Sequence, residues 1–152
     1  MSDLLVPLYR LPEKKPLKGF AVRRVMAHEG VAVKQWVESE FSSGWASEIL
    51  PAVSRTPSTL VVVIDTKSGD LAGFCAWDCT ALGFLGPVGV AEVYRGRGVG
   101  RVVVLEVLYA MKEQGYGYSI VGDAGPVEFF KLSCSAMVIP DSTPGIYPKA
   151  LK

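Results

Sequence analysis

Three glycines and three arginines share the nine residues VYRGRGVGR at positions 93–101. An apolar run precedes this stretch and a helix-like segment follows it, so we expect a strand, a tight turn and a helix. The first N–H groups of a helix lack partners within the helix and lie at its positive dipole end, so they bind anions, above all phosphates. Glycines let a ligand approach the backbone, and arginines add charge. The stretch predicts a phosphate cradle, with a solvated, glycine-capped turn as the alternative.

The glycine spacing differs from that of the common nucleotide-binding loops. GRGVG reads G-x-G-x-G, which is neither the dinucleotide pattern G-x-G-x-x-G nor the P-loop pattern G-x-x-x-x-G-K-[ST]. The turn also comes after three or four expected strands, whereas a dinucleotide-binding turn normally follows the first. A different phosphate ligand is therefore expected.

Overall charge and composition exclude several classes of protein. The 152 residues carry a formal net charge of +1, so no basic field favours nucleic acid as a partner. No apolar run approaches the roughly 20 residues that span a membrane, and the first residues lack the order of a signal peptide, so we expect a cytoplasmic protein. The three cysteines do not suit a disulfide framework. Cys75, Cys79 and His28 do not supply four ligands at zinc spacing, so no metal site is expected.

The apolar pattern predicts one mixed α/β domain at residues 17–152, preceded by a proline-broken N-terminal arm at 1–16. The expected elements are a strand at 19–27, a helix at 31–41, a short helix after Gly44 with Ser43 as its cap, strands at 59–65, 71–80 and 84–92, a helix at 100–115, a strand at 118–122, a helix at 126–132 and a strand within 136–140.

The turn and its neighbours resemble a known family. Residues 95–100, RGRGVG, match the [QR]-x-x-G-x-[GA] signature of the GCN5-related N-acetyltransferase (GNAT) superfamily, and the likeness extends over residues 18–148. The resemblance implies the GNAT fold, an α/β domain with a mixed sheet, and acetyl-CoA as acyl donor. It also implies which residues bind the pyrophosphate: backbone N–H groups from Arg97, Gly98, Val99, Gly100 and Arg101, with Gly96 in the same turn and with charge from Arg95 and Arg97.

The strand before the turn is kinked by Gly86 and Pro87. The resemblance implies that this strand splays from the strand at 118–121, so that Val88, Gly89 and Val90 border the amide arm of coenzyme A. An N–H group near Val88 or Val90 would then polarise the thioester carbonyl. Phe130, on the last helix, is expected to border the cofactor as well. A bulged edge strand is the alternative.

The chain departs from the family pattern at the proton donor. Phe130 stands where many members have a tyrosine acid, and Asp123 stands where they have asparagine. Candidates for the acid are Tyr118, Tyr147, Cys134 and water. Candidates for the base are Glu92, Asp78 and a water chain. Packed or solvated side chains are the ordinary alternative for each residue.

The resemblance also implies that the acceptor is recognised by the segment between the first two helices. There Trp45 and Glu48 could hold a cationic amine, although Trp45 could equally pack in the core. The sequence thus predicts an N-acetyltransferase that acts on a small-molecule amine. The alternative is a GNAT-fold module that binds acyl-CoA as a sensor or regulator without turnover. Val102 and Leu105, near the polar side of the long helix, suggest a possible homodimer.

Overall fold

A seven-stranded mixed sheet forms the centre of the computed structural model, which describes residues 1–152. The strand order is β2-β3-β4-β5-β6-β1-β7. Only the β5–β6 pair is parallel; all other neighbours are antiparallel. The strands are β1 (Leu4–Pro7), β2 (Phe20–Arg24), β3 (Leu60–Asp65), β4 (Leu71–Trp77), β5 (Phe84–Val90), β6 (Tyr118–Val121) and β7 (Met137–Val138).

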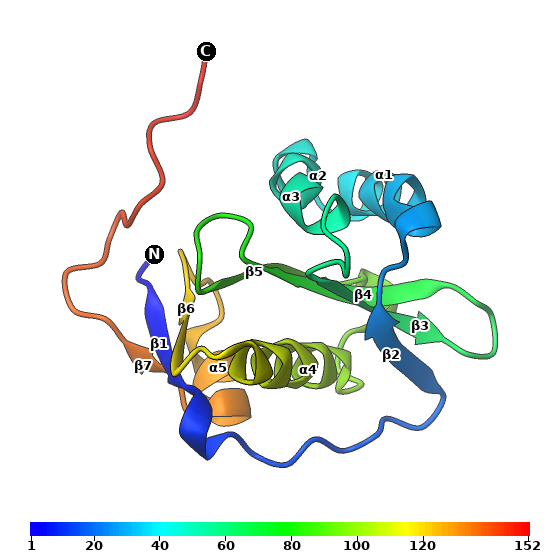
Figure 1. Ribbon diagram of the computed structural model, residues 1–152, viewed down its shortest axis with the longest axis horizontal. Coiled ribbons are helices and arrows are strands. Elements are labelled where there is room, and N and C mark those ends of the chain that lie inside the picture. Colours follow the sequence, from blue (N-terminus) through cyan, green and yellow to red (C-terminus); the bar gives the residue numbers. More distant parts are fainter.

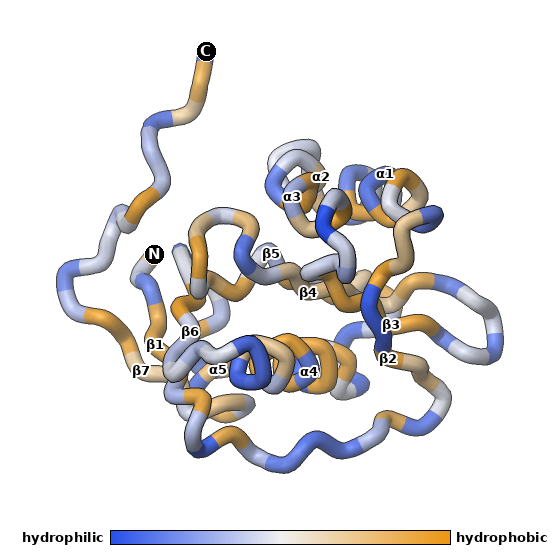
Figure 2. Tube along the Cα trace, in the orientation of Figure 1, coloured by the Kyte–Doolittle hydropathy of each residue, from blue (hydrophilic) through white to orange (hydrophobic).

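Helices cover both faces of the sheet. Figure 1 shows α1 (Gly30–Glu40), α2 (Ser43–Glu48) and α3 (Leu50–Val53) on one face, and α4 (Val99–Gln114) and α5 (Val127–Cys134) on the other. Each face has its own core, with 23 buried residues on the α4 side and 10 on the α1 side. Figure 2 shows the apolar residues gathered along α4, whereas the connection from β1 to β2 is largely hydrophilic. The expected mixed α/β fold is confirmed.

The helix α2 begins at Ser43, the residue that was expected to be its cap. Ser42, not Ser43, is the N-cap, because its extended backbone places Oγ 3.1 Å from the N–H of Trp45, which donates to it. Ser43 is already the first helical residue. The cap fixes where α2 starts and hence where Trp45 and Glu48 lie.

The first residues belong to the sheet rather than to a separate arm. β1 pairs with both β6 and β7, and Leu4, Val6 and Leu8 are buried in the α4-side core. Only the connection after the short 3₁₀ helix η1 (Leu8–Arg10) runs without regular structure. The prolines in this region therefore do not keep the N-terminal residues out of the core.

The same connection covers the side of α4 on which a homodimer was suggested. Leu17 packs against the core, and the Tyr109 hydroxyl donates to the carbonyl of Pro12 at 2.9 Å. Leu105 is buried and Val102 is half-buried. The exposed apolar patch that suggested a dimer is thus absent.

Candidate functional site

The turn before α4 presents a row of backbone N–H groups without partners. α4 begins at Val99, after Gly98 in the left-handed region with φ of +86°, and no side chain caps it. The Gly98 carbonyl accepts from Val102 N at 3.2 Å, but no protein acceptor pairs with the N–H groups of residues 97–101. These five consecutive donors lie at the positive end of a 16-residue helix, which makes them a strong electrostatic site for an anion.

Close packing holds this helix entrance against the sheet. A Cβ on Gly73 of β4 would lie 2.8 Å from Val99 Cγ1, so only glycine lets α4 approach so closely. A Cβ on Gly100 would lie 3.3 Å from the Phe129 ring and 3.4 Å from Val90 Cγ2. The unpaired N–H groups are therefore fixed beside the end of β5 and the start of α5.

Strand β5 separates from β6 after two residue pairs. Phe84 pairs with Ile120 and Leu85 with Val121, and no further pair follows. Gly86 has φ of +129°, and Pro87 has no N–H to donate. The expected splay between these strands is confirmed, and it leaves one edge of β5 open.

The open edge of β5 is the one that Val88 and Val90 face. Ala91 N donates to Ala72 O at 2.8 Å, so the backbone groups of Gly89 and Ala91 point toward β4. Those of Val88 and Val90 must point the other way, and the Val90 carbonyl indeed accepts from Arg95 Nε at 3.4 Å. The N–H groups of Val88 and Val90 are thus available to a ligand in the gap.

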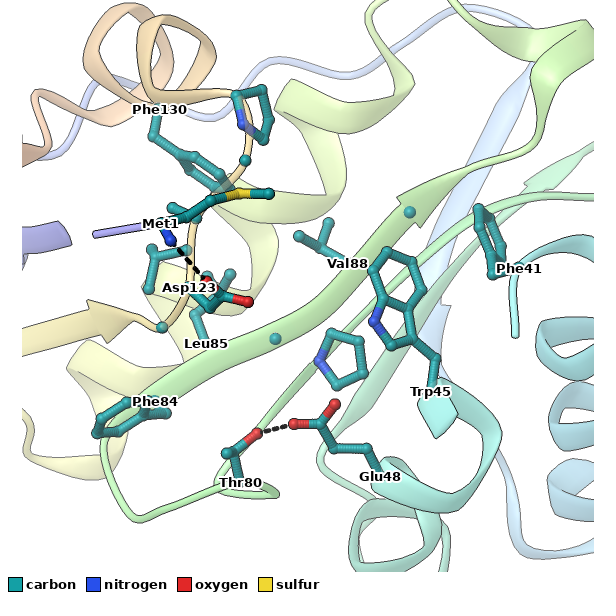
Figure 3. Close-up of a pocket in the computed structure, with 18 of the residues that line it drawn as sticks. Met1, Phe41, Trp45, Glu48, Thr80, Phe84, Leu85, Val88, Asp123 and Phe130 are labelled. Atoms are coloured by element: carbon teal, nitrogen blue, oxygen red, sulfur yellow. Dashed lines mark hydrogen bonds and ion pairs between the residues drawn. The ribbon is translucent and has the colours of Figure 1, made fainter. Parts of the chain in front are cut away.

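A cleft of about 1060 Å³ occupies the gap and continues to α2 (Figure 3). One end is bordered by β5, the helix entrance and α5, and the other by α2, the β4–β5 turn and the C-terminal segment. Of the expected cofactor and acceptor residues, eight line the cleft: Val88, Gly89, Val90, Arg95, Gly100, Phe130, Trp45 and Glu48. The sequence therefore identified residues at both ends of one cavity.

The α2 end of the cleft carries a small polar cluster. Glu48 Oε2 accepts from the Tyr147 hydroxyl at 2.7 Å and from the Thr80 hydroxyl, whereas Oε1 has no protein donor. Burial raises the pKa of Tyr147 to about 12, and the Glu48 carboxylate adds to the rise. Trp45 borders the cleft and also packs on Phe41, with ring centroids 5.3 Å apart.

Five of the expected cofactor-binding residues are absent from the cleft lining: Gly96, Arg97, Gly98, Val99 and Arg101. The Arg97 guanidinium lies over the rings of Phe20 and Tyr94, 5.1 and 5.5 Å from their centroids. The Arg97 side chain thus packs on these two rings and does not line the cleft. Gly96 has φ of +76°, and the Arg101 side chain is exposed outside the cleft.

Four of the five residues considered for proton transfer lie outside the cleft: Asp78, Glu92, Tyr118 and Cys134. The Asp78 carboxylate is buried in the β4–β5 turn, where it accepts from Gly83 N, the Tyr116 hydroxyl and Gln114 Nε2 at 2.7, 2.8 and 3.1 Å. Its role is to hold the turn. Glu92 is exposed in the 3₁₀ helix η3 (Glu92–Tyr94), because the chain leaves the sheet there. Tyr118 is half-exposed at the start of β6 and packs edge-on against Tyr9, with centroids 5.7 Å apart.

Of the other acid candidates, only Tyr147 lines the cleft. Cys134 is buried and donates its thiol to the Phe130 carbonyl at 3.2 Å. Sequence reasoning did not connect Tyr147 and Thr80 with Glu48, because 99 and 32 residues separate them from it and no local pattern links them. No group of three or more His, Cys, Asp or Glu side chains is placed to hold a metal ion. No helix has both the length and the apolar character needed to cross a membrane.

Comparison with known proteins identifies the fold and the family. Residues 30–131 match the model of the acetyltransferase (GNAT) family. No curated protein sequence matches the chain.

Solved structures share the fold at low sequence identity. The GCN5-related glucosamine N-acetyltransferase region of a fungal multi-domain GH3 β-N-acetylglucosaminidase superposes with a TM-score of 0.75 and 16% identity, over 91% of this chain and 19% of that one. A GCN5-related N-acetyltransferase from Sphaerobacter thermophilus superposes with a TM-score of 0.73 and 19% identity, over 91% of this chain and 48% of that one. This chain thus spans about a fifth of the length of the fungal protein and about half of the length of the Sphaerobacter protein. A GNAT family acetyltransferase from Brucella melitensis, solved with acetyl-CoA, superposes with a TM-score of 0.56 and 19% identity, over 88% of this chain and 92% of that one.

Proposed function

Because this chain belongs to the GNAT acetyltransferase family, we propose that it transfers an acetyl group from acetyl-CoA to an amine of a small molecule. The observation that carries the proposal is the row of five unpartnered N–H groups at residues 97–101, which lies beside the gap between β5 and β6. A pyrophosphate matches that row in charge and in hydrogen bonding. A fold relative contains acetyl-CoA, which supports the same donor here.

The donor follows the open edge of β5. With its pyrophosphate on the helix entrance and near Arg95, coenzyme A extends its amide arm along the N–H groups of Val88 and Val90. One of these N–H groups donates to the thioester oxygen as negative charge develops there. Phe130 packs against the arm but cannot donate a proton, so the departing thiolate takes its proton from water.

The acceptor binds at the α2 end of the cleft. Glu48 Oε1 accepts from the amine, and the Trp45 ring packs on its apolar body. Water takes one proton from the ammonium group, and the neutral nitrogen then attacks the thioester carbonyl carbon. As the amide forms, the second nitrogen proton passes to water and the C–S bond breaks, which releases coenzyme A as the thiolate. Glu48 supplies negative charge at this end of the cleft, whereas the Asp123 carboxylate, which also lines the cleft, pairs with the Met1 amino group at 3.3 Å. The charge of Glu48 suits a small cationic amine.

Release of free thiol from acetyl-CoA, screened over small amines and polyamines, tests the proposal. We expect turnover with at least one amine and a loss of CoA affinity of tenfold or more in Gly98→Glu, because the new carboxylate repels the pyrophosphate. Gly69→Glu is the matched control, since Gly69 has φ of +81°, close to the +86° of Gly98, and lies in the turn between β3 and β4. Normal CoA affinity in Gly98→Glu would contradict the proposed cradle.

A second candidate function, binding of acyl-CoA without turnover, is favoured by one observation. Phe130 occupies the position at which the family resemblance leads us to expect a tyrosine acid, and it lines the cleft. Tight stoichiometric binding of CoA with no thiol release for any amine would support this alternative. Turnover with any amine would exclude it.

A further inference from the structure

The C-terminal residues 139–147, here called the strap, cross from one wall of the cleft to the other. The strap starts on the β1–β6 wall, where Ile139 N donates to the Asp3 carbonyl at 2.9 Å. Asp3 N donates to Ser142 Oγ at 2.8 Å, and that hydroxyl donates to the Ile139 carbonyl at 2.6 Å. Asp3 is buried, and its Oδ1 accepts from Asp123 N at 2.8 Å, so the strap is fixed to the end of β6.

A glycine directs the strap over this anchor. Gly145 has φ of +73°, and a Cβ there would lie 3.2 Å from both Asp3 Oδ1 and the Ser142 carbonyl. A larger residue would be strained and crowded at this point. Tyr147 then reaches the opposite wall, where its hydroxyl donates to Glu48 Oε2 at 2.7 Å and lies 3.5 Å from Thr80 Oγ1.

We infer that Tyr147 is a positioning and specificity-determining residue for the acceptor, an inference that rests on the proposed function. Two hydroxyl donors occupy Glu48 Oε2, so only Oε1 remains for an amine. Tyr147 lines the acceptor end of the cleft, beside Glu48. The strap therefore orients the Glu48 carboxylate and limits the bulk of the amine that can approach it, which favours unbranched primary amines.

Kinetics of Tyr147 variants separate this role from a purely structural one. We expect Tyr147→Phe to raise the KM for the amine about 5- to 20-fold, because a hydrogen bond to a partly exposed carboxylate is lost, while the KM for acetyl-CoA stays within about twofold. Tyr147→Ala should in addition admit branched and N-alkylated amines that the wild type rejects. Tyr9→Phe is the control, since Tyr9 is exposed on η1 and does not line the cleft. An unchanged amine KM and an unchanged ranking of amines in both Tyr147 variants would overturn the inference.

A second measurement does not depend on turnover. The strap predicts nuclear Overhauser effects between the Tyr147 ring and the Thr80 methyl group in the free protein, and their absence would overturn the inference. If these contacts are present but no amine is acetylated or bound although CoA binds, the proposed function fails. The role of Tyr147 in amine selection then fails with it, while closure of the strap still stands. The two failures are thereby distinguishable.

Discussion

Gly89 on β5 is the position at which a single added methyl group should disturb both the core and the cleft. An ideal Cβ there would lie 2.6 and 2.7 Å from Phe41 Cε1 and Cζ, and 3.1 Å from Phe74 Cε1. Carbon atoms pack at about 3.5–4.0 Å, so the Phe41 ring must retreat by about 1 Å. Phe74 has no exposed surface and cannot absorb the movement freely.

The Phe41 ring lines the cleft on one side, and a retreat would take it off the aromatic rings that it packs on. It packs on Trp36, Trp45 and Phe74, with centroid separations of 5.5, 5.3 and 5.3 Å. Overpacking of this kind costs about 1–3 kcal/mol, so we expect Gly89→Ala to lower the free energy of unfolding by about 2 kcal/mol. Because Phe41 contacts Trp45 at the α2 end of the cleft (Figure 3), the KM for the amine should rise as well.

Urea unfolding at neutral pH measures this change, with the m-value checked for constancy. Gly117→Ala is the matched control, because nothing lies within 4 Å of its ideal Cβ and its φ is not in the left-handed region. The control should be neutral or slightly stabilising. A loss below about 0.5 kcal/mol in Gly89→Ala, or an equal loss in both variants, would refute the packing argument.

Three further predictions concern side chains away from the cleft. Asp78→Ala should lower the free energy of unfolding, measured in urea, by about 2–4 kcal/mol, because it removes the acceptor of three hydrogen bonds. Its CoA affinity, measured by titration calorimetry, should stay unchanged. The Arg23 guanidinium lowers the pKa of Glu29 to about 2, so the pair stabilises the fold above the ordinary glutamate pKa and its contribution disappears as the pH falls toward 2. Since both side chains are partly exposed, the free energy of unfolding of the wild type should exceed that of Glu29→Gln by only about 1 kcal/mol at pH 6. An equal difference at pH 2 would contradict a stabilising ion pair between Arg23 and Glu29. Burial raises the pKa of Cys79 and of Cys134 to about 11, so iodoacetamide should label these thiols slowly at neutral pH, faster as the pH rises toward 11, and completely in denaturant.

The glycine turn and the strands around it could be predicted because their signals are local. The left-handed Gly98, the helix that follows it and the kink at Gly86 and Pro87 all depend on backbone chemistry readable over a few residues. The resemblance to the family used the same stretch, and the family model confirms it.

Long-range contacts explain what could not be predicted. β1 is four residues long and ends in Pro7, so it has little strand signal of its own, and it forms because β6 and β7 pair with it. Arg97 and Asp78 are polar residues beside an expected site, but Arg97 finds two aromatic rings and Asp78 finds three donors within the fold. The sequence around Arg97 and Asp78 does not show which side chains the fold will bring into contact with them.

The most direct test of the account is a crystal structure of the protein with acetyl-CoA bound. We expect pyrophosphate oxygens within about 2.7–3.2 Å of backbone N–H groups at residues 97–101, and the thioester in the gap between β5 and β6. A pyrophosphate bound elsewhere, or an empty helix entrance at saturating acetyl-CoA, would contradict the central claim.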